Sequence, residues 1–221
     1  MFKEGRKEDE SMIFKPHEVA YNIARINNLN NSVILNFDNE EREFKCLSTS
    51  FELVSRTEDN MVNGNVYLNL ISKDLLLHNI SYLDLINKDY MNFITYKFDS
   101  DIRKRLRDKT ELRYNKDEDQ YKDTSIGKIY APSIYDIPNI DVYDRPKEHY
   151  NFLKSQYFSD LGKLIKEMKG ENRLWLTRSE LIDQKKVYAL NIRTKEFIKV
   201  DLDTKCDMVI CISLKVTDNK V

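Results

Sequence analysis

The segment from Tyr121 to Tyr150 constrains the fold of this chain more than any other. It contains three of the chain's four prolines, with five tyrosines spaced among them (YKDTSIGKIYAPSIYDIPNIDVYDRPKEHY). Proline removes a backbone hydrogen-bond donor and biases the residue before it away from helix. Loops of this length are usually functional or disordered, and disordered segments are poor in aromatic residues. We therefore expect residues 121–147 to form an extended arm that lies along another surface, either of its own domain or of a partner.

The charges of the chain nearly cancel, with 36 basic residues against 37 acidic ones and a net charge of −1. Nucleic-acid-binding proteins usually carry a clear basic surplus, so this balance argues against that general class while leaving room for a local basic patch. The composition is rich in Asn, Lys, Ile and Tyr and poor in Ala. We take this bias to indicate AT-rich coding, as in a phage, a mobile element or a low-GC bacterium.

Cysteine usage and hydropathy favour a cytoplasmic protein. The three cysteines are an odd number without a CxxC pair, so we expect free thiols in a reducing compartment. No apolar run reaches the roughly 18 residues that a membrane helix needs, and we expect no membrane partner. Residues 1–11 are expected to form a charged, flexible tail, because they lack the apolar stretch of a signal peptide.

Apolar periodicity predicts an N-terminal α+β part, 12–120, and a C-terminal part, 148–221, which we expect to share one domain. Alternating apolar residues predict strands at 33–37, 44–46, 66–70 and 208–216, and a hairpin of 187–192 with 196–202. Helical spacing, with helix-start boxes at Ser81–Asp84 and Thr177–Glu180, predicts about four helices, at 16–29, 82–94, 148–169 and 177–185. Strands in both halves with helices between them favour an α+β fold with a mixed or mainly antiparallel sheet.

No catalytic or cofactor motif rises above chance in this chain. It has no GxGxxG, Walker A or GxSxG sequence, and none of its three histidines belongs to HExxH or to a Cys/His ligand pattern. A metal-independent ribonuclease needs a base, an acid and a cation, and Tyr143, Arg145 and His149 have the chemistry for these roles. Such residues often fall close together by chance in so charged a chain. We expect no cofactor and lean away from an enzyme.

The first predicted hairpin carries a weak nuclease-like pattern. Glu43-Phe44-Lys45 has the E-x-K form of a metal-dependent nuclease, and Asp38 stands five residues before Glu43, across the turn. Such an enzyme holds Mg²⁺ with two or more carboxylates and places a lysine near the attacking water. Short patterns of this kind match by chance, so the simpler interpretation is a solvated hairpin face.

A cluster of basic residues between Ile102 and Lys116 is the best candidate for contacting phosphates. Its first members are Arg103, Lys104, Arg105 and Arg107. Acidic residues at 117–119 follow at once and weaken the local positive field. The simpler interpretation is a solvent-exposed helix whose charges pair with one another.

These observations favour a non-enzymatic protein that works by protein–protein contact or assembly. The expected contact residues lie in the arm, because tyrosine and arginine are enriched at interface hot spots, and they are Tyr130, Tyr135, Tyr143 and Arg145. The alternative is a nuclease or nucleic-acid-binding protein that uses the basic cluster after Ile102 or the Asp38 and Glu43 pair as a metal site. The sequence leaves the identity of the partner open.

Overall fold

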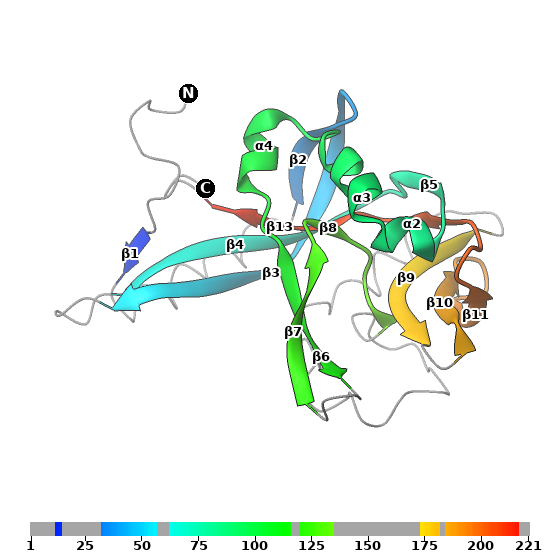
Figure 1. Ribbon diagram of the computed structural model, residues 1–221. Coiled ribbons are helices and arrows are strands. Elements are labelled where there is room, and N and C mark those ends of the chain that lie inside the picture. Colours follow the sequence, from blue (N-terminus) through cyan, green and yellow to red (C-terminus); the bar gives the residue numbers. More distant parts are fainter. Residues whose placement is uncertain are drawn as a thin grey trace.

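The computed structural model describes residues 12–14, 32–56, 62–115, 120–134, 173–181 and 184–216. Within these ranges the chain forms three sheets and three helices, and the helices follow one another in a single stretch of sequence (Figure 1). Most strand pairs are antiparallel, which confirms the predicted α+β class in outline. The helices predicted at 16–29 and 148–169, the tail 1–11 and residues 135–147 lie outside the described residues.

The first sheet has the strand order β2-β3-β4-β13-β8, and β1 (Met12–Phe14) pairs with the first three residues of β4. Its strands are β2 (Ser32–Phe37), β3 (Glu40–Arg56), β4 (Val62–Ser72), β13 (Cys211–Lys215) and β8 (Ile129–Tyr130). Asp38 and Asn39 join β2 to β3 with φ angles of 57° and 63°. Two consecutive positive φ angles define the tight turn that matches the twist of paired strands, and Asp and Asn tolerate this conformation. The predicted first hairpin is thus confirmed.

The second sheet has the order β11-β10-β9-β12-β5. Its strands are β11 (Glu196–Asp201), β10 (Lys186–Asn191), β9 (Leu174–Leu181), β12 (Cys206–Met208) and β5 (Leu77–Ile80). The pairing of β10 with β11 confirms the predicted second hairpin. The β9–β12 pair is parallel, whereas the other pairs of this sheet are antiparallel.

The helix predicted at 177–185 is wrong, because β9 continues as a strand to Leu181. The Thr177 hydroxyl, which was expected to cap a helix, donates instead to the carbonyl of Tyr188 on β10 at 2.6 Å. Trp175, Leu176 and Thr177 are fully buried, and β9 is paired with β10 on one side and β12 on the other. Pairing of Glu180 and Leu181 with β10, together with the bond from the Arg178 amide to the Pro132 carbonyl, therefore overrides the local helix-start signal.

Two chain segments pass from one sheet to the other at the same place. The chain leaves β4 at Ser72 and enters β5 at Leu77, while β12 leads into β13 through residues 209–210. The Ser72 amide donates to the Ile210 carbonyl at 2.8 Å, and the Ile210 amide donates to the Ser72 hydroxyl at 2.9 Å. These bonds satisfy backbone groups where the ladders are interrupted, so the single strand predicted at 208–216 becomes two strands in two sheets.

The alternation predicted for 208–216 is nevertheless confirmed. The even-numbered residues Met208, Ile210 and Ile212 pack into the larger core cluster. Val209 and Cys211 point the other way, into a smaller cluster that contains Trp175. Successive side chains of an extended chain point to opposite faces, so this segment is buried on both sides, as expected.

The three described helices are α2 (Tyr82–Ile86), α3 (Lys88–Thr95) and α4 (Ser100–Arg105). The sequence predicted one helix over 82–94, but the chain breaks at Asn87, whose backbone is extended. The Asn87 side-chain oxygen accepts from the amides of Asp89 and Tyr90 at 3.0 and 3.2 Å, so it caps the start of α3. Among the described residues, no helix is long and apolar enough to cross a membrane.

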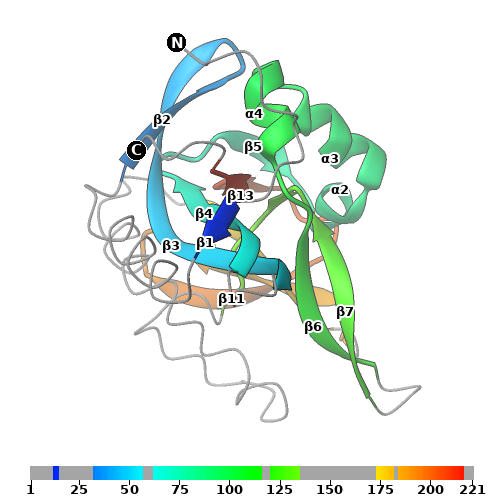
Figure 2. The ribbon, with the colours of Figure 1, turned by 90° about the vertical axis from the view of Figure 1, so that its left-hand side faces the viewer.

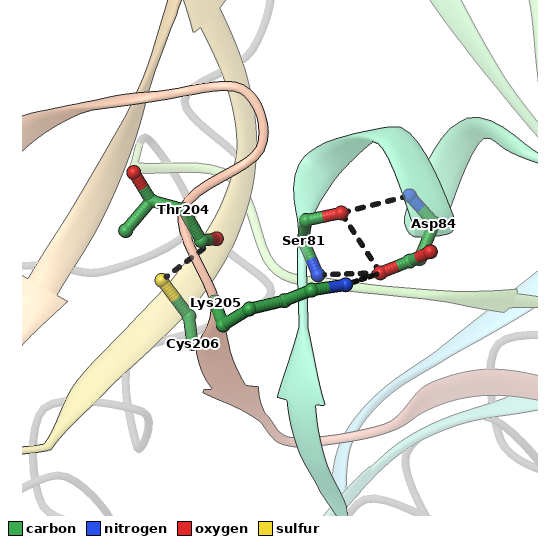
Figure 3. A network of polar contacts seen from close by, with 5 residues as sticks. All are labelled: Ser81, Asp84, Thr204, Lys205 and Cys206. Carbon is green, nitrogen blue, oxygen red and sulfur yellow. Dashed lines mark hydrogen bonds and ion pairs between the residues drawn. The ribbon is translucent and has the colours of Figure 1, made fainter.

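A capping box fixes the start of α2 (Figure 3). The Asp84 carboxylate accepts from the Ser81 amide and hydroxyl at 2.9 and 2.8 Å, and Lys205 donates to the same oxygen at 2.7 Å. The Lys205 hydrogen bond is the main reason that the pKa of Asp84 lies below its ordinary value, although burial opposes the shift. Because Lys205 directly precedes β12, this network ties α2 to the second sheet.

Three buried phenylalanines join the first hairpin to the chain that follows α3. Phe98 contacts Phe37 edge to face, with ring centroids 4.9 Å apart, and its ring lies 5.9 Å from that of Phe44. All three are at most 2% exposed. The Asp38 amide also donates to the Lys97 carbonyl at 2.7 Å, so the tip of the hairpin is held against the end of α3.

A two-stranded hairpin of β6 (Lys109–Asn115) and β7 (Gln120–Gly127) projects from the body of the molecule (Figures 1 and 2). The charged helix expected over 102–116 is therefore wrong beyond Arg105, where α4 ends. The first part of the expected arm is extended, but it belongs to the domain. Residues 120–127 pair with β6, and Ile129–Tyr130 pairs with β13.

Candidate functional site

Tyr130, which the sequence nominated for partner contact, is a core residue. It is 4% exposed and packs in the smaller core cluster with Ile71 and Trp175. Its hydroxyl lies 3.5 Å from the Ser213 hydroxyl, and the Arg178 guanidinium lies 5.7 Å from its ring centroid. The partner-binding prediction is wrong for Tyr130, because its ring cannot reach a partner while β8 stays paired with β13.

The other predicted contact residues, Tyr135, Tyr143 and Arg145, lie outside the described residues. The same holds for His149 and for the ribonuclease arrangement that involved it. Contact through residues 135–147 therefore stays a prediction from the sequence.

The basic cluster after Ile102 is divided between separate intramolecular contacts. The Arg103 guanidinium lies 4.8 Å from the Tyr96 ring centroid and donates to the Tyr96 carbonyl at 3.4 Å. The Arg105 Nε donates to the carbonyl of Lys215 at 2.9 Å. Lys104 is exposed. The four cations of this cluster therefore do not form one continuous row that faces a single ligand.

Arg107, the fourth of these cations, is bound to the first sheet. Its Nη2 lies 2.7 Å from the Glu52 Oε1, and its guanidinium lies 4.5 Å from the Tyr67 ring centroid. The Tyr67 hydroxyl donates to the other Glu52 oxygen at 2.7 Å. Burial and this hydrogen bond to Glu52 raise the pKa of Tyr67 to about 12. The group links β3, β4 and the chain after α4, which is a structural role.

The nominated metal ligands Asp38 and Glu43 engage different cations. Asp38 sits in the hairpin turn and accepts from Lys97 at 2.7 Å. Glu43 lies on β3 and pairs with Lys73 at 2.6 Å. In the part of the chain that the structure describes, no three His, Cys, Asp or Glu side chains gather as a metal site would require.

Glu43 is the centre of a local ion-pair network. Besides Lys73 it accepts from the Ser32 hydroxyl at 2.7 Å, and Lys45 lies 3.5 Å from its Oε1. The hydrogen bonds from Lys73 and Ser32 lower the pKa of Glu43 to about 2, against a small opposing effect of burial. The two charged residues of the E-x-K pattern thus take part in contacts that link β2, β3 and the chain at the end of β4.

His78 is an exposed residue of β5. Its Nδ1 lies 2.9 Å from Asp207 on the neighbouring β12. Arg173 lies 3.5 Å from the other oxygen of the same carboxylate. This arrangement is a cross-strand polar contact at the surface.

Large exposed apolar side chains gather on α2 and α3. Five such side chains occur among the described residues, and four belong to these helices or to the C-cap of α3: Leu83 (48% exposed), Ile86 (57%), Phe93 (63%) and Tyr96 (70%). We call these four residues the α2–α3 surface. Leu83 and Ile86 are three residues apart, as are Phe93 and Tyr96, so each pair shares one side of its helix.

Sequence periodicity missed this surface because it treated 82–94 as one helix. In that register Tyr82, Ile86, Tyr90, Phe93 and Ile94 form a single stripe that would face the core. The break at Asn87 changes the phase, so that Tyr82 and Ile94 are buried while Ile86 and Phe93 are exposed. Asn87 with Asp89 shortly after it is a local helix-start signal, and it could have revealed the break.

A pocket of about 340 Å³ lies between α2–α3 and the chain from the end of β7 through β8. This volume falls near the lower end of the range for ligand pockets, roughly 300–1,000 Å³. The structure places α3 against β8 and α2 against β9 (Figure 1). Apolar lining comes from Tyr82, Leu85, Ile86, Met91, Ile126, Ile129, Tyr130 and Ala131.

Charged groups enter this pocket from several elements. Lys88 begins α3, Lys128 lies between β7 and β8, Arg178 belongs to β9, and the one acid among the described lining residues is Asp108. Glu180 accepts from the Tyr82 hydroxyl at 3.0 Å and adds a negative charge nearby. In the part of the lining that the structure describes, cations therefore outnumber acids even when Glu180 is included.

Arg178 is fixed in place by the chain opposite. Its Nη1 donates to the Ala131 carbonyl at 2.8 Å, and its amide donates to the Pro132 carbonyl at 3.0 Å. Gly127 has a φ of +90°, a conformation that side-chain-bearing residues rarely adopt. The chain therefore turns at Gly127, between the end of β7 and Lys128. No sequence motif indicates this site, because its described residues come from four separate segments of the chain.

No protein family model matches the chain, and no curated protein or solved structure shows significant similarity to it.

Proposed function

We propose that this protein is a non-enzymatic binding or assembly protein that contacts another protein through the α2–α3 surface. The observation that carries the proposal is the concentration of large exposed apolar side chains on two short neighbouring helices. Single exposed apolar residues are ordinary, but gathered ones mark interaction sites. All three cysteines are free thiols, which is compatible with the reducing cytoplasm of a low-GC bacterium, where a phage or a mobile element would also act.

The chemistry of the α2–α3 surface suits protein recognition. Phe93 and Tyr96 offer large rigid rings with few rotatable bonds, so ordering them on binding costs little entropy. The Arg103 guanidinium stacks on Tyr96 and holds that ring in place. Aromatic residues and arginine are enriched at the centres of interfaces, where they account for much of the binding energy.

The ionisable residues that suggested a nuclease or nucleic-acid contact support this choice indirectly. Glu43, Arg105 and Arg107 each make contacts that join elements of the fold. A nuclease or nucleic-acid-binding protein is the second candidate, and the cationic excess of the pocket favours it. The two candidates predict different behaviour when nucleic acid is removed.

The test is an affinity capture from a lysate of the source organism, run with and without nuclease treatment. We expect the wild-type protein to retain a protein partner after nuclease treatment. The combined variant Leu83→Ser, Ile86→Ser, Phe93→Ser and Tyr96→Ser should lose that partner while it unfolds at nearly the same temperature. Ile34→Thr is the matched control, because Ile34 is an equally exposed apolar residue on β2 (58%).

Two results would count against the proposal. Loss of every partner on nuclease treatment of the wild type would favour nucleic-acid binding. Retention of the partner by the fourfold variant would place the contact elsewhere, and the predicted residues Tyr135, Tyr143 and Arg145 would then be the next to change.

A further inference from the structure

We infer that the pocket beside α2 and α3 binds an acidic peptide segment of the partner, with a large apolar side chain in the cavity and a neighbouring carboxylate against Lys88 and Lys128. This inference rests on the proposed function, since it names the chemistry of the partner segment. Its test changes Lys88 and Lys128, which do not belong to the α2–α3 surface, so the two proposals can be tested separately.

The apolar part of the pocket continues the α2–α3 surface. Ile86 is 57% exposed and belongs both to that surface and to the pocket lining. Met91 and Ile126 are half-buried, and they line the pocket from opposite sides. An occupant that fills the cavity and extends past Ile86 toward Leu83 covers more surface than a small ligand does. A peptide segment can place one side chain in the cavity and a neighbouring side chain on the surface between Ile86 and Leu83.

The cations of the pocket select an acidic segment. Among the described residues, neither Lys88 nor Lys128 takes part in an ion pair, whereas Arg178 is held by the Ala131 carbonyl. In the described part of the lining, one carboxylate opposes these cations, that of Asp108. Potentials of opposite sign on the two partners speed encounter and disfavour wrong partners. A peptide that carries an acidic residue next to its large apolar residue supplies the ion-pair partner that Lys88 and Lys128 lack within the described protein.

The positions of the two lysines make the charge accessible to a segment lying across the pocket. Lys88 is the exposed first residue of α3, and Lys128 is half-buried after the turn at Gly127. They therefore belong to opposite walls, one helical and one from the β7–β8 chain. An extended acidic peptide that crosses the mouth can place carboxylates near both.

The test uses the full chain and random dodecapeptides displayed on phage. Peptides are selected on the wild-type protein and counter-selected on the double variant Lys88→Glu and Lys128→Gln. Glu at the first position of a helix is favourable, so Lys88→Glu should fold. A thermal melt of each variant checks this. We expect enrichment of sequences with Asp or Glu beside a large apolar residue.

The best selected peptide is then labelled with fluorescein and titrated by anisotropy. Its Kd should rise at least tenfold for Lys88→Glu and severalfold for Lys128→Gln, which removes the charge and keeps a polar side chain. Lys195→Glu, in the turn between β10 and β11 and outside the pocket lining, makes the same charge change as Lys88→Glu and should leave the Kd within twofold. Raising the salt concentration should weaken wild-type binding, because contacts between exposed charges are screened.

Four results overturn the inference. The first is a selection without acidic enrichment, and the second is equal binding by the wild type and the double variant. The third is displacement of the peptide by submillimolar inorganic phosphate or adenosine monophosphate, which would assign the pocket to a small phosphate ligand. If the double variant still captures the lysate partner that the fourfold α2–α3 variant loses, the pocket inference fails while the proposed function stands.

Discussion

Replacing Ser81 with alanine should destabilise the protein by about 1–2 kcal/mol, and the magnitude follows from the two bonds that its hydroxyl makes. The hydroxyl accepts from the Asp84 amide at 3.3 Å and donates to the Asp84 carboxylate at 2.8 Å. Loss of an N-cap side chain typically costs about 1 kcal/mol, and a hydrogen bond to a charged group contributes roughly 1.5–3 kcal/mol. The second term is reduced here, because the Asp84 side chain is 32% exposed and keeps Lys205 as a partner.

The assay is thermal unfolding followed by circular dichroism, with urea unfolding to obtain the free energy. For a chain of this length, 1 kcal/mol corresponds to a shift in Tm of about 2–4 °C, so we expect a fall of roughly 2–8 °C. Ser100→Ala is the matched control, since Ser100 lies at the start of α4, where no side chain caps the helix. Its effect should stay within about 0.5 kcal/mol, as for most surface changes.

The reasoning would be refuted if Ser81→Ala and Ser100→Ala had equal effects. A second check combines Ser81→Ala with Asp84→Asn. Because these two residues bond to each other, their effects should add up to more than the effect of the double variant. Simple additivity would mean that the capping box does not hold α2.

Three further predictions follow from the fold. Phe98→Ala should lower the free energy of unfolding, measured in urea, by about 3–5 kcal/mol, since Phe98 is buried against two other rings. Phe93 is exposed, so Phe93→Ala should change this free energy by less than about 0.5 kcal/mol. The pKa of Glu43 is lowered to about 2, so this group contributes stability above its ordinary pKa of 4.5 and loses it as the pH falls toward 2. Glu43→Gln should therefore cost roughly 1 kcal/mol at pH 7, with the difference from wild type shrinking below pH 4.5 in urea unfolding. A thiol reagent such as Ellman's should label Cys46 first in the native protein and reach Cys206 and Cys211 only on unfolding. Both of these thiols are buried, and burial raises the pKa of Cys206 to about 11. Equal labelling rates for all three thiols would contradict this burial.

Local chemistry predicted those parts of the fold in which neighbours along the chain decide the structure. Asp38 and Asn39 form the turn that their residue types favour, and Ser81 with Asp84 forms the capping box that the spacing indicates. The alternation around Val209 also holds, because a segment buried on both sides keeps a period of two whichever sheet it joins.

The predictions that proved wrong concern parts of the chain whose structure depends on contacts with segments distant in the sequence. The box Thr177 to Glu180 has the same form as the one at Ser81, yet it lies in β9, since Glu180 pairs with β10 and the Arg178 amide donates to the Pro132 carbonyl. The pocket was beyond reach for the same reason, because its walls come from residues 82–95, 108, 125–131 and 178. Only the broken helix at Asn87 had a local signal that sequence analysis could have used.

The most direct test of the binding role is site-specific photocrosslinking in the source organism. A benzoylphenylalanine residue placed at Phe93 should form an adduct with a protein that survives nuclease digestion, while the same probe at Ile34 should form none. Phe93 and Ile34 are similarly exposed, at 63% and 58%, so unequal labelling reports on a partner and not on accessibility. The account would be contradicted by equal adducts at both positions, by no adduct at Phe93, or by an adduct that nuclease removes.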